Sequence, residues 1–300
     1  MTCHGLLSYP LNMDKTRPSL KTRLDILCKT FGKAYLTTDP LLFVHRYKTG
    51  PEREIVGLIT SSLAYGRVDG IKRSVEAVLA EMGSSPYDFT MQFDPRKDKE
   101  RFAGIIHRFN KAEDVRCLIY FIRQMIEESG SISGFFMKGY SKDTLDIKDG
   151  LLAFVKGALS LDTAGVYGRQ RLPQSAGVRF FFPSPSDSSP CKRLNLYLRW
   201  MVRRKDGLDL GIWKGISPAK LIIPLDTHIA RISRNIGLTS RKSPDWKMAA
   251  EITASLRQFD SQDPVKYDFA ICRLGIIDAC PKRRDADKCG ACMIKDVCVL

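Results

Sequence analysis

Apolar residues recur at helical spacing along most of the 300-residue chain. In residues 112–130 they occupy the positions of one helix face, namely Val115, Leu118, Ile119, Ile122 and Ile126. This period of about 3.6 residues is typical of amphipathic helices. Runs that alternate apolar and polar residues are scarce, and the best strand candidate is GVRFFFP at 177–183. The sequence therefore predicts an all-α fold.

Residues 161–190 interrupt the helical pattern with Gly, Pro and Ser and with little periodicity. The composition predicts a long loop at this point of an otherwise helical chain. Loops of this length inside a compact protein are usually functional or disordered.

The bulk composition, with 44% hydrophobic and 27% charged residues, is that of a soluble globular protein. No stretch approaches the roughly 18 apolar residues that a membrane span requires. Residues 1–21 lack the basic and apolar pattern of a secretory leader. We therefore expect a cytoplasmic protein, acting as a monomer, with no membrane partner.

The chain is strongly basic, with 48 Lys and Arg against 33 Asp and Glu and a formal charge of +15. The excess is densest in residues 191–300, which hold 21 basic and 12 acidic side chains. Such a balance favours a polyanionic partner, either a nucleic acid or an anionic membrane face.

Four of the nine cysteines, Cys280, Cys289, Cys292 and Cys298, follow the spacing C-x8-C-x2-C-x5-C. Four thiolates can hold either a tetrahedral zinc ion or an iron-sulfur cluster. A zinc ribbon normally has two C-x2-C knuckles, whereas this segment has one, which favours a single loop around one larger cluster. Zinc and unrelated free thiols remain the alternatives. The other cysteines occur singly and are expected to be small core or surface residues: Cys3, Cys28, Cys117, Cys191 and Cys272.

The stretch DKCGACMIKDVC resembles the C-terminal cluster loop of endonuclease III and the adenine glycosylases. The last three cysteines match that loop in spacing, and the first is displaced by two residues. The resemblance implies a 4Fe-4S cluster in residues 280–298, beside a DNA-binding face. It also implies that the basic side chains of this loop contact DNA, unless they are only solvated charges: Lys282, Arg283, Arg284 and Lys288.

Asp226 follows Pro224 and precedes an apolar helix face, so the sequence predicts that it caps a helix N-terminus. The segment PLDTHIARISRNIGL, residues 224–238, resembles the VDTH segment of the helix-hairpin-helix glycosylases. The resemblance implies that Asp226 stabilises positive charge on the deoxyribose as the base leaves, although a purely structural cap is an alternative. We expect Arg231 and Arg234, which lie off the apolar face, to contact phosphates, and we assign His228 no catalytic part.

Lys192 begins a predicted helix 34 residues before Asp226. In bifunctional members of that superfamily a lysine at the start of a helix attacks C1′ of the sugar. The resemblance implies this part for Lys192, and an ordinary phosphate contact is the alternative. Arg199 and Arg203 share one stripe of the helix with Lys192, so we expect phosphate contacts there, and we count Arg193 among the DNA-binding residues.

Tyr65 lies in the segment EIVGLITSSLAYGRVDGIKRSV, which resembles the helix-loop-helix where endonuclease III inserts a side chain into the base stack. The resemblance implies that Tyr65 fills the gap left by a flipped base; a tyrosine in the interior of a helix is the alternative. The chain departs from the family pattern at 183–191, PSPSDSSPC, where the glycine-containing hairpin is absent.

Together these features imply one glycosylase-like unit of two helical lobes over residues 1–300. The implied function is excision of a damaged or mispaired base from duplex DNA, with or without abasic-site lyase activity. The alternative is a non-catalytic nucleic-acid-binding protein on the same scaffold, acting as a damage sensor or an RNA binder.

Overall fold

The computed structural model describes residues 19–204, 206–277 and 279–299, which leaves Cys3 outside the described part. Within these residues the chain forms helices and no strand, so the all-α prediction is confirmed. The best strand candidate, 177–183, is not a strand, because Gly177–Phe181 forms a 3₁₀-helix. Val178 and Phe181, three residues apart, both face the core, as the three-residue period of that helix requires.

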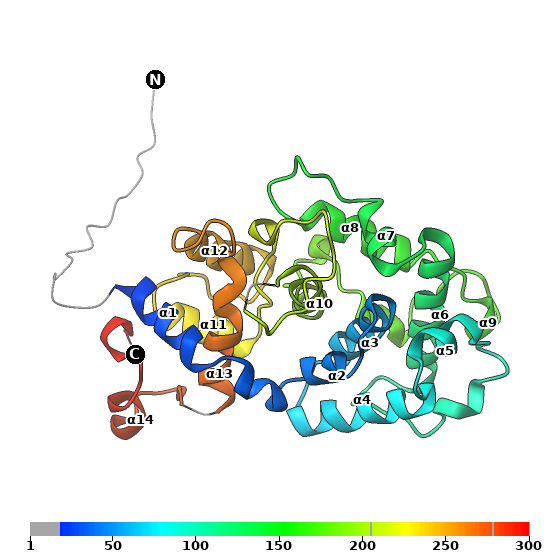
Figure 1. Ribbon diagram of the computed structural model, residues 1–300, viewed down its shortest axis with the longest axis horizontal. Helices are drawn as coiled ribbons and strands as arrows, with labels where there is room; N and C mark the ends of the chain where they lie inside the picture. Colours follow the sequence, from blue (N-terminus) through cyan, green and yellow to red (C-terminus); the bar gives the residue numbers. More distant parts are fainter. Residues whose placement is uncertain (1–18, 205, 278, 300) are drawn as a thin grey trace.

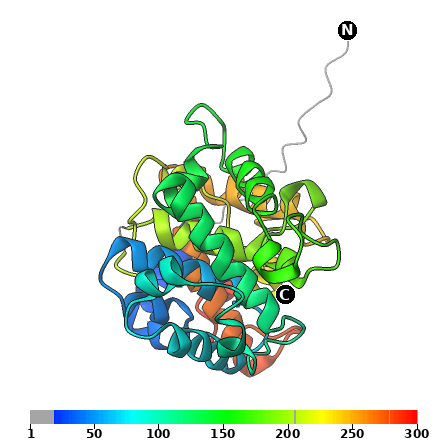
Figure 2. The ribbon, with the colours of Figure 1, turned by 90° about the vertical axis from the view of Figure 1, so that its right-hand side faces the viewer.

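One group of helices gathers at the right-hand end of Figure 1. It comprises α3 (Gly50–Ser62), α4 (Val68–Met82), α5 (Pro86–Gln92), α6 (Ala112–Ser129), α7 (Ile132–Met137), α8 (Lys148–Ala158) and α9 (Ala164–Tyr167). Figure 2 looks onto this end, with the cyan and green helices toward the viewer. The 18-residue α6 packs against α3, α5, α7 and α9 and is the central helix of the group.

A second group lies at the opposite end of Figure 1. It comprises α1 (Leu20–Thr30), α11 (Thr227–Asn235), α12 (Trp246–Arg257), α13 (Asp268–Ile276) and α14 (Ala286–Gly290). Between the two groups lie α2 (Leu41–His45) and α10 (Lys192–Val202), both packed on α3. The remaining elements are 3₁₀-helices: η1 (Lys33–Thr38), η2 (Lys99–Phe102), η3 (Gly177–Phe181), η4 (Pro185–Asp187), η5 (Pro218–Lys220), η6 (Pro264–Tyr267) and η7 (Lys295–Val297).

The contact between α3 and α10 depends on a glycine. A Cβ on Gly57 would lie 2.5 Å from Cε of Met201 and 3.1 Å from Cε2 of Tyr197, so a larger residue would displace the end of the Met201 side chain and press on the Tyr197 ring. The hydroxyl of Tyr197 donates to the carbonyl of Glu54, 3.1 Å away, across the same contact. This close packing holds the second half of α10 against the middle of α3.

Residues 161–190 contain α9, η3 and η4 joined by irregular backbone. Several apolar side chains of the segment are buried, and η3 packs on α6 while η4 packs on α8: Leu172, Val178, Phe181, Phe182 and Pro185. The segment is thus a packed layer of short turns and not an open loop. No described helix is long and apolar enough to cross a membrane.

Candidate functional site

A cavity of about 400 Å³ is lined by residues from both helix groups and from the helices between them. Its walls come from the start of α10, the start of α11, one face of α13, the connection between α3 and α4, and the junction of η1 with α2. Lys192 and Asp226 both line it, and we call it the Lys192–Asp226 cavity. Its volume lies within the range of small-molecule sites, about 300–1,000 Å³.

Lys192 is the first residue of α10, and its ammonium group donates to the carbonyl of Ala64, 3.0 Å away, on the α3–α4 connection. The chain turns into this helix through left-handed backbone at Ser188 (φ 58°) and Cys191 (φ 48°). The Cys191 thiol lies 3.3 Å from the carbonyl of Pro183, which helps to hold the turn. Non-glycine residues therefore make the turn that precedes the lysine.

Asp226 caps α11 as predicted: its Oδ1 accepts the backbone N–H of Ile229 at 2.8 Å. Its Oδ2 accepts from the thiol of Cys272 at 3.5 Å. Burial raises the pKa of Cys272 well above its ordinary value, so this thiol stays protonated at neutral pH. Cys272 is therefore a hydrogen-bond donor to Asp226 and does not supply a thiolate nucleophile.

Asp268 lies one turn before Cys272 on α13 and forms part of the same wall. Burial raises the pKa of Asp268 to about 6; Arg199 opposes the shift and the negative charge of Asp226 adds to it. Arg199 pairs with Asp268 and, at 3.2 Å, with Asp209. The wall of the cavity thus holds the ion pair of Arg199 and Asp268 in addition to Lys192 and Asp226.

The expectation that Arg199 contacts phosphates needs correction, and so does that for Arg203. Both side chains are only about 2% exposed. Arg203 pairs with three carboxylates, those of Asp206 at 2.6 Å, Asp263 at 2.8 Å and Asp209. A guanidinium held by buried carboxylates cannot reach a DNA backbone, so these cations are structural.

Arg193 is also buried, which corrects its assignment to the DNA-binding set. Its guanidinium stacks over the ring of Phe180, 3.7 Å from the centroid, and donates to the carbonyl of Ser62 at 3.3 Å. Burial lowers the pKa of Arg193 to about 10. Arg193 therefore packs against the rings of Phe180 and Tyr65 and does not face solvent.

Tyr65 follows the end of α3, so the alternative of an interior helical tyrosine is wrong. Its hydroxyl lies 2.5 Å from Oδ1 of Asn110 and 2.9 Å from the carbonyl of His107, which fixes the ring. The ring packs against Phe109 and Phe180. Phe109, 56% exposed, is the most solvent-accessible ring of this cluster.

Arg231 points at the cysteine loop, residues 280–298, and not at solvent. Its Nη1 donates to the carbonyl of Pro281 at 2.6 Å and lies 3.1 Å from Sγ of Cys280. The phosphate contact expected for Arg231 is thus corrected to a contact that holds the loop. Arg234 donates to the carbonyl of Lys242 at 3.1 Å. The basic residues expected to face DNA are exposed: Lys282, Arg283 and Arg284.

The four cysteines of the loop line one cavity of about 650 Å³: Cys280, Cys289, Cys292 and Cys298. The loop is tied to the helices by the backbone N–H of Val299, which donates to the carbonyl of Asn235 at 2.8 Å, and by the ion pair of Arg23 with Asp296. Across the described residues, no group of three or more His, Cys, Asp or Glu side chains is placed to hold a metal ion. The donor set itself is soft and suits zinc or an iron-sulfur cluster.

Asp268 and Cys272 are among the polar residues of the cavity wall that sequence reasoning missed. The available signal was their spacing of four residues, which puts both on one face of α13. His228 also lines the cavity and packs where Gly275 has no side chain, since a Cβ there would overlap the imidazole.

One comparison with known proteins gives a match. A family model described as a protein of unknown function (DUF2400) matches residues 39–277, which include every residue that lines the Lys192–Asp226 cavity except Thr38. The cysteine loop lies beyond the matched residues. No curated protein and no solved structure matches the chain.

Proposed function

The chain belongs to the DUF2400 family, whose function is unknown, and we propose that it is a DNA base-excision glycosylase of the helix-hairpin-helix type. The substrate is a damaged or mispaired base in duplex DNA. The reaction takes place in the Lys192–Asp226 cavity, with Lys192 as nucleophile and Asp226 as electrostatic stabiliser.

One observation carries the proposal: Lys192 and Asp226 line the same cavity although they begin different helices. An amine and a carboxylate in one cavity are the groups that a nucleophilic attack on the sugar and the stabilisation of its developing positive charge require. Apolar wall residues offer faces against which a flat base can pack: Leu196, Phe269 and Ile276.

In the proposed step the amine of Lys192, after losing a proton, attacks C1′ of the extruded nucleotide. The C1′–N glycosidic bond breaks, and its electron pair leaves with the base, which takes up a proton. The carboxylate of Asp226 stabilises the positive charge that develops on the sugar. Before it attacks, Lys192 must break its hydrogen bond to the carbonyl of Ala64 and turn toward C1′ of the substrate.

We further propose that the four loop cysteines hold a 4Fe-4S cluster, with zinc as the alternative. The support is that one cavity brings together four soft donors and no other side chains of that kind. The cluster would stabilise the folded loop, on which Lys282 and Arg283 are exposed to solvent. Iron and acid-labile sulfide, measured after anaerobic purification, should each approach four per chain. Stoichiometric zinc without sulfide would show that the metal is zinc.

A second candidate function rests on the segment 183–191. This stretch has no glycine, and its backbone turns at Ser188 and Cys191. It therefore lacks the glycine hairpin whose backbone N–H groups bind a phosphate in the helix-hairpin-helix glycosylases. That difference favours a nucleic-acid-binding protein without catalysis, a damage sensor or an RNA binder.

Borohydride trapping separates the two functions. The protein is mixed with a duplex that carries one abasic site, and borohydride reduces any Schiff base to a stable amine. We expect a covalent adduct with the native protein and none with Lys192→Ala or Lys192→Arg. Lys192→Arg keeps the positive charge, so it should still bind duplex. No adduct from native protein that binds the duplex tightly would favour the binding function or a glycosylase that uses water.

A further inference from the structure

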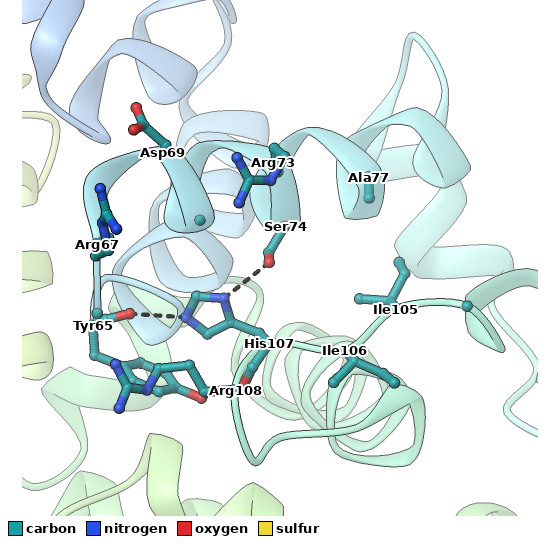
Figure 3. Close-up of a pocket in the computed structure, with 13 residues that line it drawn as sticks. Tyr65, Arg67, Asp69, Arg73, Ser74, Ala77, Ile105, Ile106, His107 and Arg108 are labelled. Atoms are coloured by element: carbon teal, nitrogen blue, oxygen red, sulfur yellow. Dashed lines mark hydrogen bonds between the residues drawn. The ribbon is translucent and has the colours of Figure 1, made fainter.

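A second cavity, of about 610 Å³, is drawn in Figure 3. It is formed by the first turns of α4 and by residues 104–108, which precede α6. Three arginines line it, Arg67, Arg73 and Arg108, and we call it the arginine pocket. Gly66 and Arg67 line both cavities, so the arginine pocket shares a wall with the Lys192–Asp226 cavity.

The three guanidinium groups have no carboxylate partner among the described residues, in contrast to Arg199 and Arg203. Asp69 is the one acidic side chain in the lining, and it forms no ion pair within the described part of the chain. Three cations against one anion leave the pocket with a net positive charge. Guanidinium groups of this kind, exposed and uncommitted, are well suited to phosphate oxygens.

The position of Arg108 is built into the backbone. Arg108 has left-handed backbone (φ 56°), which a non-glycine residue rarely adopts. Its side chain lies over Gly66, where a Cβ would come within 3.0 Å of Cδ and 3.2 Å of Nη1. The glycine and the left-handed arginine together aim a cation into the pocket.

His107 holds the two sides of the arginine pocket together (Figure 3). Its Nε2 lies 3.0 Å from the carbonyl of Tyr65, which can only accept, so Nε2 carries the proton. Its Nδ1 then accepts from the hydroxyl of Ser74, 2.9 Å away on α4. Burial lowers the pKa of His107, which keeps the imidazole neutral. The positive charge of the pocket therefore comes from the arginines.

We propose that the arginine pocket binds the backbone phosphates next to the nucleotide that enters the Lys192–Asp226 cavity. This inference rests on the proposed function. Its basis is the shared wall at Gly66 and Arg67: a strand that delivers one nucleotide to the first cavity must run its neighbouring phosphodiesters across that wall. A pocket with three uncommitted guanidiniums is the surface that would receive them.

The test is equilibrium binding of a labelled duplex with a stable abasic analogue, measured by fluorescence anisotropy at several salt concentrations. Arg73→Gln and Arg108→Gln should each weaken binding about tenfold and reduce the slope of log K against log salt by about 1. Arg171→Gln removes the same charge from an exposed position that lines neither cavity, and it should change neither quantity.

A further variant adds a negative charge to the arginine pocket without removing a side chain. A Cβ on Gly70, in the first turn of α4, meets no atom within 4 Å. Gly70→Glu should therefore place a carboxylate in the arginine pocket and weaken duplex binding, whereas Gly70→Ala should bind as the native protein does. Asp69→Asn should strengthen binding.

The outcomes separate this inference from the proposed function. Weakened binding in the arginine variants supports the phosphate site even where no borohydride adduct forms. A borohydride adduct with native protein, together with arginine variants that bind like Arg171→Gln, would overturn the phosphate site and leave the glycosylase.

Discussion

The carboxylate of Asp226 acts through two oxygens that face different partners. Oδ1 accepts the N–H of Ile229 and starts α11, while Oδ2 accepts from Cys272 at the edge of the cavity. The structural part and the electrostatic part of this residue are therefore separable by substitution, because asparagine caps helices about as well as aspartate but carries no charge.

Asp226→Asn should leave the free energy of unfolding within about 0.5 kcal/mol of the native value, since the cap is retained. Excision activity should fall by about 100-fold or more, because the charge that we propose stabilises the transition state is removed. Asp226→Ala should lose about 1 kcal/mol in addition. Urea unfolding and single-turnover excision measure the two effects. An Asn variant with native activity would reduce Asp226 to a cap.

Segments with short-range partners were predictable from the sequence. The cap of α11 was predicted correctly, because Asp226 and its partner Ile229 lie three residues apart. The start of α10 at Lys192 was also predicted correctly, although no side chain caps that helix. The buried arginines were not, because Arg199 pairs with a carboxylate 69 residues away and Arg203 with one 60 residues away. Their basic spacing on α10 is the same whether they face DNA or a buried acid.

At the scale of elements, His107 joins α4 to the segment before α6 through Ser74 and Tyr65. This junction was beyond the sequence, since nothing in a single histidine indicates which two segments it bridges. The apolar residues of 161–190 present a similar limit: they pack in short turns and so show no helical period.

The neutral imidazole of His107 makes this junction sensitive to pH. Because the folded pKa is lowered below the ordinary value near 6.5, protons bind the unfolded chain more readily. The contribution of neutral His107 to the free energy of unfolding is complete above pH 6.5. It is lost as the pH falls toward the pKa of His107 in the folded protein. In urea unfolding from pH 7.5 to 5, the difference in stability between native protein and His107→Gln should therefore shrink as pH falls. A difference that grows would mean that a charged His107 is stabilising.

At the scale of the whole molecule, the buried ions around Arg203 connect α10, between the two helix groups, to Asp263 at the start of η6. Asp209 and Arg199 extend the network to Asp268 on α13. Removing one member leaves buried carboxylates without a partner, which costs far more than the loss of an exposed pair.

Arg203→Met should lower the free energy of unfolding by about 3–5 kcal/mol, because Asp263 would remain buried without its cation and Asp209 would keep only Arg199 as a partner. Arg204→Met, at the next and exposed position, should stay within about 0.5 kcal/mol of the native protein. Chemical denaturation of both variants provides the comparison. Equal stability of the two would mean that the network contributes nothing net to folding.

The packing of α1 determines when the protein can finish folding during its synthesis. The buried side chains Leu24 and Leu27 belong to a helix that packs on α13 and η6, and Cys28 donates to the carbonyl of Lys266, 238 residues later. At translation rates of about 5–20 residues per second, α1 leaves the ribosome roughly 10–50 s before those partners exist. Throughout that interval its apolar face has no native cover, which makes it a natural place for a chaperone to bind the nascent chain.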